Sequence, residues 1–138
     1  MSAQAGRDAL IKIGDGGGPE TFTSIGGMRI KRTRFGQTLV DSTDQDSTGR
    51  WRELLASASK KFVRLEGEGV FKDTASEEAV RTAFFGDTLT NFQFVFPDWG
   101  TIQGAFLVAR LDTDSDAELE LRYRMVFESG GAITWTGA

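Results

Sequence analysis

Hydrophobic and polar residues alternate through most of the chain, which is the pattern of half-buried β-strands. The clearest example is at residues 92–96, where phenylalanines alternate with polar side chains, and a second lies at 118–128, where apolar and charged residues alternate. Further strands are predicted wherever the alternation recurs between turn residues, at 10–13, 20–25, 28–35, 60–71, 101–111 and 132–135. Most of the chain is therefore expected to be β-structure.

A helical pattern is predicted at residues 74–85. Thr74 and Glu77 have the spacing of a capping box, and an apolar stripe follows before Gly86. A shorter amphipathic turn is expected at 50–57, since Trp51, Leu54 and Leu55 have the spacing i, i+3 and i+4. One main helix among seven or eight hairpin-spaced strands indicates a mainly β fold, a β-sandwich or barrel with one flanking α-helix.

Length and composition indicate one domain and narrow the possible chemistry. The 138 residues suit a single core spanning 1–138. The chain has no histidine and no cysteine, which excludes a Ser-His-Asp triad, a cysteine nucleophile and the usual zinc sites. No apolar stretch approaches the ~18 residues of a membrane-spanning helix, and the first residues lack a signal-peptide core. Synthesis in the cytoplasm and no membrane association are expected.

Three motifs have features of chemical sites, and none fits one fully. The glycine run at 14–19 lacks the spacing of a phosphate-binding loop and is interpreted as a turn. The acidic run at 112–116 resembles the start of a calcium loop, but Ala117 and Tyr123 stand where glycine and glutamate are required. The glutamate pairs at 66/68 and 118/120 are more typical of an ion-paired strand face than of an acid/base dyad. No catalytic, cofactor-binding or metal-binding residue is predicted.

The net charge of −4 disfavours a dedicated nucleic-acid-binding protein. One basic cluster lies in the predicted strand at 28–35, and Arg29 and Lys31 are expected on the face opposite Met28 and Ile30. The cluster consists of Arg29, Lys31, Arg32 and Arg34. Pairing with carboxylates across a subunit interface is the favoured interpretation, and contact with a phosphate backbone is the alternative.

A long polar loop is predicted at about 36–50, because the chain has no apolar face there after Val40. Loops of this length in compact domains are usually functional or disordered. Strand faces of mixed charge and short strands at the sheet edges add to this picture, since monomeric proteins tend to protect such edges. These features together favour ordered self-assembly.

The order of motifs along nearly the whole chain resembles that of the major tail tube proteins of long-tailed phages and phage-like gene transfer agents. The matching segments are Phe-Thr-Ser-Ile-Gly-Gly-Met-Arg at 22–29, Val-Asp-Ser-Thr at 40–43, Trp-Arg-Glu-Leu-Leu at 51–55, Glu-Gly-Glu-Gly-Val-Phe-Lys-Asp at 66–73, Phe-Pro-Asp-Trp-Gly-Thr-Ile-Gln-Gly at 96–104 and Phe-Glu-Ser-Gly-Gly at 127–131. No immunoglobulin-like extension is present in the sequence.

The resemblance implies hexameric rings that stack into a hollow tube through which DNA passes, with an inner sheet continuous between subunits. It implies that the helix lies on the outer wall and that short terminal arms, at 2–7 and 136–138, lie at ring contacts. The residues expected at ring-stacking and inter-subunit contacts are Val40, Asp41, Asp44, Asp46, Trp51, Leu54, Leu55, Arg29, Lys31 and Arg34. The residues expected to face an acidic lumen are Glu66, Glu68, Glu118 and Glu120.

The resemblance also implies a place in the tail of a virion or particle, with no enzyme activity and no cofactor. The other expected partners are tail proteins, namely the tape measure, the terminator and the baseplate hub. DNA would pass without sequence-specific binding. Two alternatives stay open: a related tube initiator or secretion-system tube ring, and a carbohydrate- or ligand-binding β-sandwich.

Overall fold

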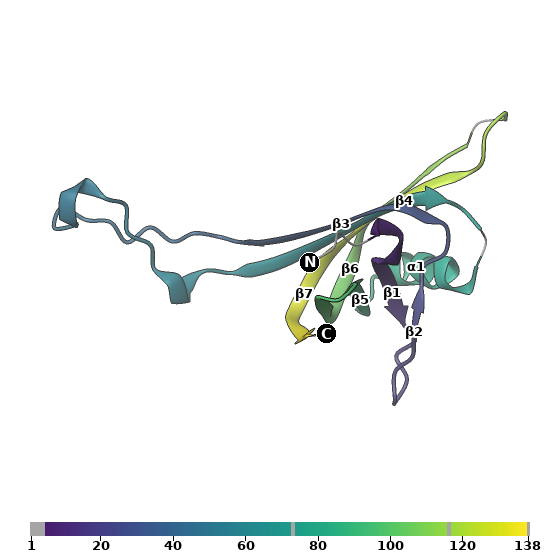
Figure 1. The fold of residues 1–138 in the computed structure, drawn as a ribbon, viewed down its shortest axis with the longest axis horizontal. Coiled ribbons are helices and arrows are strands. Elements are labelled where there is room, and N and C mark those ends of the chain that lie inside the picture. The colour runs from purple at the N-terminus through teal and green to yellow at the C-terminus, as the bar shows by residue number, and fades with distance from the viewer. Residues whose placement is uncertain (1–4, 73, 116, 138) are drawn as a thin grey trace.

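The computed structural model describes residues 5–72, 74–115 and 117–137 (Figure 1). Its strands form one antiparallel sheet in the order β2-β1-β5-β6-β7-β4-β3, and a single α-helix packs against it. The elements are β1 (Leu10–Gly14), β2 (Phe22–Ser24), β3 (Met28–Gln37), β4 (Lys61–Val70), α1 (Ala75–Phe85), β5 (Thr90–Phe96), β6 (Gly100–Asp114) and β7 (Arg122–Gly137). The prediction of a mainly β fold with one flanking helix is confirmed.

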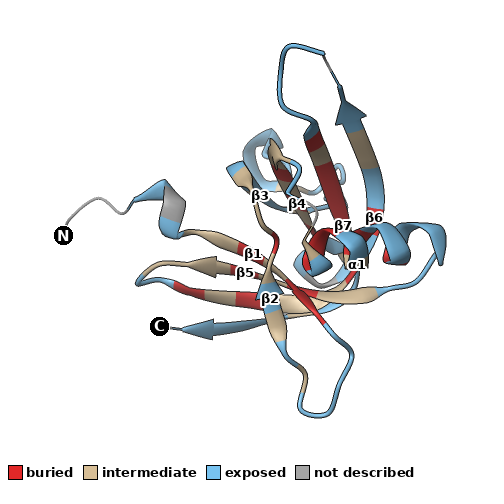
Figure 2. Ribbon diagram, turned by 90° about the vertical axis from the view of Figure 1, so that its right-hand side faces the viewer, coloured by how far each residue is buried: buried red, intermediate tan, exposed pale blue. Residues whose placement is uncertain are grey.

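The sheet has two parts that run in different directions, and the long strands β6 and β7 extend through both of them (Figure 2). The first half of β6 pairs with β5 on one side and with the end of β7 on the other. The second half of β6 pairs with the start of β7, which in turn pairs with β4. Register shifts after Gly104 and Val108 interrupt the β6–β7 ladder, and such bulges bend a sheet.

Two sequence-based predictions were wrong. From Arg122 onward, the expected strands at 118–128 and 132–135 form one strand, β7, because the strand continues through Gly130 and Gly131 as a register shift between the pairs Phe106–Ser129 and Gly104–Ile133. The amphipathic turn at 50–57 is absent: Leu54 forms an antiparallel bridge with Asp41, flanked by short 3₁₀ turns at Thr48–Arg50 and Ala56–Ala58. Tertiary pairing overrides helical spacing in so short a segment.

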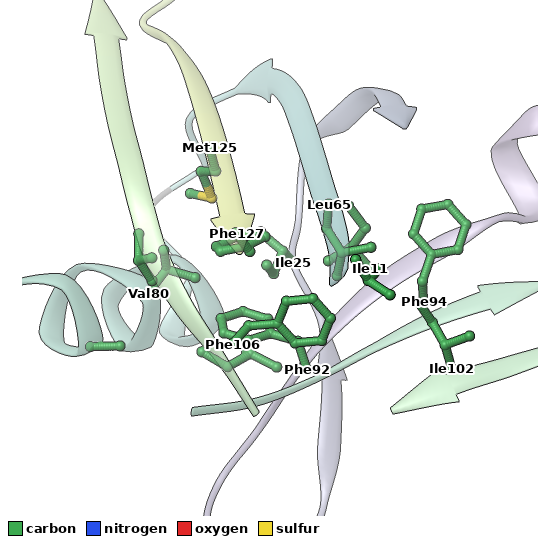
Figure 3. Packing of buried hydrophobic residues seen from close by; sticks show 14 of the residues in the cluster. Ile11, Ile25, Leu65, Val80, Phe92, Phe94, Ile102, Phe106, Met125 and Phe127 are labelled. Atoms are coloured by element: carbon green, nitrogen blue, oxygen red, sulfur yellow. The ribbon is translucent and has the colours of Figure 1, made fainter. Parts of the chain in front are cut away.

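Aromatic side chains form the centre of the core (Figure 3). Phe92, Phe106 and Phe127 are fully buried; Phe92 stacks on Phe127 with ring centroids 4.3 Å apart and meets Phe106 edge-on at 6.1 Å. Helix α1 covers this cluster with Val80 and Ala83. The alternation seen in the sequence thus places one face of β4, β5 and β7 in the core, and the helix covers that core beside β6 and β1.

A buried carboxylate fixes the start of α1. Glu77 is only 3% exposed, and its carboxylate accepts hydrogen bonds from the Lys72 backbone N–H, at 3.1 and 3.2 Å, and from the Thr74 hydroxyl, at 3.0 Å. The predicted capping box does not form, since the Thr74 side chain bonds Glu77 instead of the helix backbone, and Glu77 accepts from the Lys72 N–H instead of the Thr74 N–H. The negative charge also suits the N-terminal end of the helix dipole.

Tyr123 of β7 ties the core to the turn before β3. Its hydroxyl donates a 2.7 Å hydrogen bond to the Gly26 carbonyl oxygen. Burial, and secondarily the charge of Glu77, raises the pKa of Tyr123 well above its usual range, so the phenol stays protonated as a donor. Replacing Tyr123 with Phe is expected to lower the free energy of unfolding by about 1–3 kcal/mol, because the carbonyl loses its partner.

Chemical denaturation of the Tyr123→Phe variant measures this loss. The matched control is Phe85→Leu, a change at a largely exposed aromatic residue of α1, for which a change within about 0.5 kcal/mol is expected. Equal stabilities of the Tyr123→Phe variant and the parent chain would contradict the role given to the hydroxyl.

Candidate assembly surfaces

Two strand edges, one on β3 and one on β6, carry backbone groups that have no neighbouring strand. β3 is the last strand in the sheet order, so its outer edge pairs with no other strand among the described residues. β6 has β5 beside it only as far as Phe106, and from residue 107 to 114 that edge is likewise open within the described part of the chain. Unpaired edges of this length are templates for pairing with another chain.

The four strands β6, β7, β4 and β3 present a charged face on the side away from the core. Cross-strand partners share a face, and the register places Arg32 opposite Glu66, and Glu66 opposite Val126, whose neighbour on β6 is Arg110. Charged residues of both signs occupy this face: Arg32, Arg34, Arg64, Glu66, Glu68, Arg110, Asp112, Arg124 and Glu128. Val126 is 2% exposed and lies outside the main core cluster, which indicates cover by the charged layer.

Glu66 is the centre of an ion-pair network on the charged face. Its carboxylate lies 2.9 Å from Arg64 Nε, 3.7 Å from an Arg32 guanidinium nitrogen and 3.8 Å from one of Arg124. The Glu66 side chain is only 14% exposed, whereas the three arginines are 36–61% exposed. Arg64 also reaches Glu128 at 3.4 Å, and Arg124 reaches Glu68 at 3.3 Å. The network extends across three strands.

The four glutamates expected in a lumen occupy two different places. Glu66 and Glu68 lie on the charged face. Glu118 and Glu120 precede β7 and belong to the turn after β6, because the strand begins only at Arg122. Glu120 forms an exposed 3.2 Å ion pair with Arg29.

The basic cluster is divided between surfaces. A bulge between Met28 and Ile30 shifts the register, so Ile30 faces the charged side opposite Glu68, and Lys31 lies on the other face opposite Gly67. The expectation that Met28 and Ile30 share a face was wrong for this reason. Desolvation lowers the pKa of Lys31, partly offset by Asp8. Arg34 remains on the charged face, opposite Arg64.

A projecting arm, residues 38–60, connects β3 to β4 and extends far from the rest of the molecule (Figure 1). The arm is longer than the predicted loop. Its two sides are joined by a ladder of backbone hydrogen bonds, Thr38 N–H to the Lys60 carbonyl at 2.8 Å and Leu55 N–H to the Val40 carbonyl at 2.8 Å, with Ser42 N–H to Glu53 beyond them. The arm is therefore a preformed projection.

The arm carries apolar side chains into solvent. Trp51 is 77% exposed, and the other exposed apolar residues of the arm are Leu39, Val40, Leu54 and Leu55. Three aspartates accompany them, and Asp41 accepts a 2.7 Å bond from the Thr43 N–H. Bonds from the Thr43 side chain and backbone lower the pKa of Asp41. Their stabilising effect is thus present above the ordinary value of 3.8 and is lost as pH falls through the lowered pKa.

An apolar pocket of about 680 Å³ lies at the root of the arm. Its walls come from β3, β4, β6 and β7, namely Phe35, Gly36, Gln37, Lys61, Phe62, Val63, Ile102, Gly131, Ala132, Ile133 and Trp135. Sequence reasoning missed this site, because its walls come from separate segments. The exposed Phe35, Phe62 and Trp135 were the available signal, since large apolar side chains gather at interaction sites.

The described residues hold no cluster of three or more potential metal ligands, and no helix among them is long and apolar enough to cross a membrane. Asp116 of the acidic run lies outside the described residues. Residues 2–4 and 138 of the expected terminal arms do so as well.

An antiparallel sheet with open edges, a charged face and a projecting arm defines an assembling structural protein. Residues 3–135 match the family model of the phage tail tube protein, and the chain belongs to that family. It is a structural protein of a tail tube, and its place is the tail of a phage-like particle. A search of curated proteins gave no match.

Solved structures of two gene transfer agent assemblies are similar over the full chain. A chain from the tail of an empty particle, refined with helical and C6 symmetry, is 38% identical with a TM-score of 0.92, and one from the native virion is 36% identical with a TM-score of 0.89. Each comparison covers 98% of this chain and 100% of the other. The SPP1 tail tube protein shares the fold. It is 13% identical with a TM-score of 0.75, and the comparison covers 99% of this chain and 80% of the SPP1 chain.

Proposed function

We propose that this chain forms hexameric rings that stack into the tail tube of a gene transfer agent or phage particle and that DNA passes through the tube. The observation that carries the proposal is full-length similarity, at 36–38% identity, to chains of gene transfer agent particles, one of them in a C6-symmetric tail. The proposed role is structural, without catalysis or a cofactor.

Lateral contacts in the ring are proposed to form between strand edges. The open edge of β3 in one subunit would pair with the open edge of β6 at 107–114 in the next. Such pairing gives hydrogen-bond partners to backbone groups that otherwise bond only to water. It also makes a sheet of β6, β7, β4 and β3 that is continuous around the ring. Arg29, Lys31 and Arg34 lie on β3 and would then be inter-subunit residues.

The charged face is proposed to line the lumen. The opposite side of the same strands belongs to the core, and α1 packs beside β6 on that side, so the helix would lie on the outer wall. Glu66 and Glu68 would thus face the DNA, and Glu118 and Glu120 would lie at one rim. Because four of the five arginines of this face pair with carboxylates, the lining would retain DNA only weakly through released counterions.

Contacts between rings are proposed to be made by the arm. Val40, Trp51, Leu54 and Leu55 would supply apolar contacts, and Asp41, Asp44 and Asp46 would supply polar ones. The backbone ladder supports this role, because a preformed projection loses little conformational entropy on docking.

Replacing Trp51 with Ala is expected to weaken tube assembly more than replacing Asp44. An exposed indole that becomes buried between subunits is typical of an interface hot spot worth about 2 kcal/mol or more, roughly a 30-fold rise in the critical concentration. Asp44→Ala is the control, with an expected change of about 1 kcal/mol or less. Light scattering against protein concentration measures both, and the reverse ranking would contradict an apolar anchor.

Contacts of this chain with other tail proteins are also proposals. The tape measure, terminator and baseplate hub would meet the tube at its inside and its two ends. A tube initiator is the alternative role, and a chain of the anti-feeding prophage baseplate, 12% identical with a TM-score of 0.67, shows that a baseplate assembly also uses this fold. The higher identity to tail chains favours the tube.

Electron microscopy of the purified protein across concentration and salt tests the proposal. Hollow tubes or rings with six-fold end views are the expected result. Rings of another symmetry would overturn the hexamer, and single rings that never stack, even when seeded with tail tips, would support the initiator.

A further inference from the structure

The apolar pocket at the arm root has no occupant within its own chain among the described residues. Ile102 and Val63 form a buried floor, while Phe35, Phe62 and Trp135 stand half-exposed around it. Exposed aromatic rings around a concave apolar surface are typical of a site that another molecule covers.

The arm holds its own Trp51 away from this pocket. The hydrogen-bond ladder fixes the two sides of the arm together, and Trp51 lies beyond the last of these bonds, at Ser42 and Glu53. Trp51 is nine residues from Lys60, so at about 3.3 Å per extended residue the indole lies up to roughly 30 Å from the root. Only the arm of another copy can bring a Trp51 indole to the pocket without breaking the ladder.

The backbone just before Trp51 has an unusual conformation that directs the chain at this exposed side chain. Gly49 and Arg50 both have left-handed backbone angles, with φ of 61° and 63°. This conformation is uncommon for arginine, and such local strain concentrates at functional positions. The indole is the most exposed of the three tryptophans.

We infer that the pocket at the arm root receives the Trp51 indole of a subunit in the adjacent ring. This inference rests on the proposed stacking of rings. Rings that repeat along an axis meet through two different surfaces of the same chain, which must be complementary to each other. The arm supplies an apolar projection, and the root supplies an apolar cavity of about 680 Å³.

Size and charge support the pairing. Pockets of about 300–1,000 Å³ enclose drug-sized ligands, so an indole with a neighbouring leucine fits. Residues 41–53 of the arm carry Asp41, Asp44, Asp46 and Glu53 against Arg50 and Arg52, a net charge of −2, while Lys61 lines the pocket and Lys60 is its neighbour in sequence. Opposite charges around an apolar centre orient the two surfaces.

Cross-linking tests the inference, because the chain contains no native cysteine. The variant Arg52→Cys/Ala132→Cys has one thiol beside Trp51 and one at the pocket, and Trp51 itself is kept. In assembled tubes treated with a short bis-maleimide, each chain should join two others and give covalent products far longer than six subunits. The control Arg52→Cys/Arg81→Cys moves the second thiol to the exposed face of α1 and should give no such products.

Two results would overturn docking between rings: products that stop at six subunits, which place the contact within one ring, or intact tubes without cross-links. Microscopy of the same samples separates these outcomes from a failure to form tubes, which would count against the proposed function itself.

A double-mutant cycle gives a second measurement that needs no cysteine. Trp51→Ala and Ile133→Ala should each raise the critical concentration for assembly at least about tenfold. The critical concentration of the double variant should be little higher than that of either single variant, because both changes remove the same contact. Effects that multiply in the double variant would overturn the pairing, even if both single variants assemble poorly.

Discussion

A chain that lacks residues 41–49 should fold normally and form no long tubes. The deletion removes the end of the arm, none of whose residues is buried, and leaves the sheet and the core intact. The Thr38–Lys60 and Val40–Leu55 hydrogen bonds can still form. A shorter connection changes the free energy of unfolding by only about 1 kcal/mol, because loop-closure entropy depends weakly on length.

Thermal unfolding and electron microscopy measure the two halves of this prediction. A melting temperature close to that of the parent chain, with single rings or short stacks, is expected. The matched control replaces residues 44–48 with the same number of Gly and Ser residues, which keeps the reach of the arm and its apolar residues. This control should form tubes, although with reduced yield. Tubes of ordinary length from the deletion variant would contradict the stacking role.

The strands and the core were largely predictable from the sequence. The phenylalanines at 92 and 94 alternate with polar residues, and both are buried on one face of the strand, Phe92 stacked on Phe127 and Phe94 beside Phe96. The helix was predictable because capping residues, an apolar stripe and a terminal glycine all agree there. Local signals were strong at these places and consistent with the tertiary structure.

Elements that depend on register were not predictable. The bulge after Met28 turns Ile30 to the charged face, and a one-residue shift of this kind leaves no mark in the hydrophobic pattern. The arm was expected to contain a helical turn, but pairing between Asp41 and Leu54 extends it instead. The pocket at the arm root combines residues about 100 positions apart, such as Phe35 and Ile133.

The electrostatics of the charged face were also not predictable from the sequence. The sequence indicated glutamates on one strand face and an acidic lumen. The structure shows that Glu66 and Glu68 are paired with arginines from three strands, so the face has a nearly balanced charge. If this face lines the lumen, its low affinity for DNA depends on internal pairing more than on net negative charge.

Replacing Glu66 with Gln is therefore expected to make the tube retain DNA. The change removes the carboxylate that Arg32, Arg64 and Arg124 share and keeps the side-chain size. Arg32 then loses its ion-pair partner, whereas Arg64 and Arg124 keep Glu128 and Glu68. One new phosphate contact per subunit would make DNA affinity fall by an additional factor of about 3–4 between roughly 50 and 200 mM salt. Co-sedimentation of duplex DNA with tubes across a salt series measures this slope.

Glu78→Gln is the matched control for charge. Glu78 lies exposed in the first turn of α1, so its replacement makes the same change in net charge on the side opposite the charged face. It should leave the salt slope unchanged. Equal slopes for tubes of both variants would place Glu66 outside the lumen. A steeper slope for the Glu66 variant alone would show that intact ion pairs keep the conduit non-adhesive.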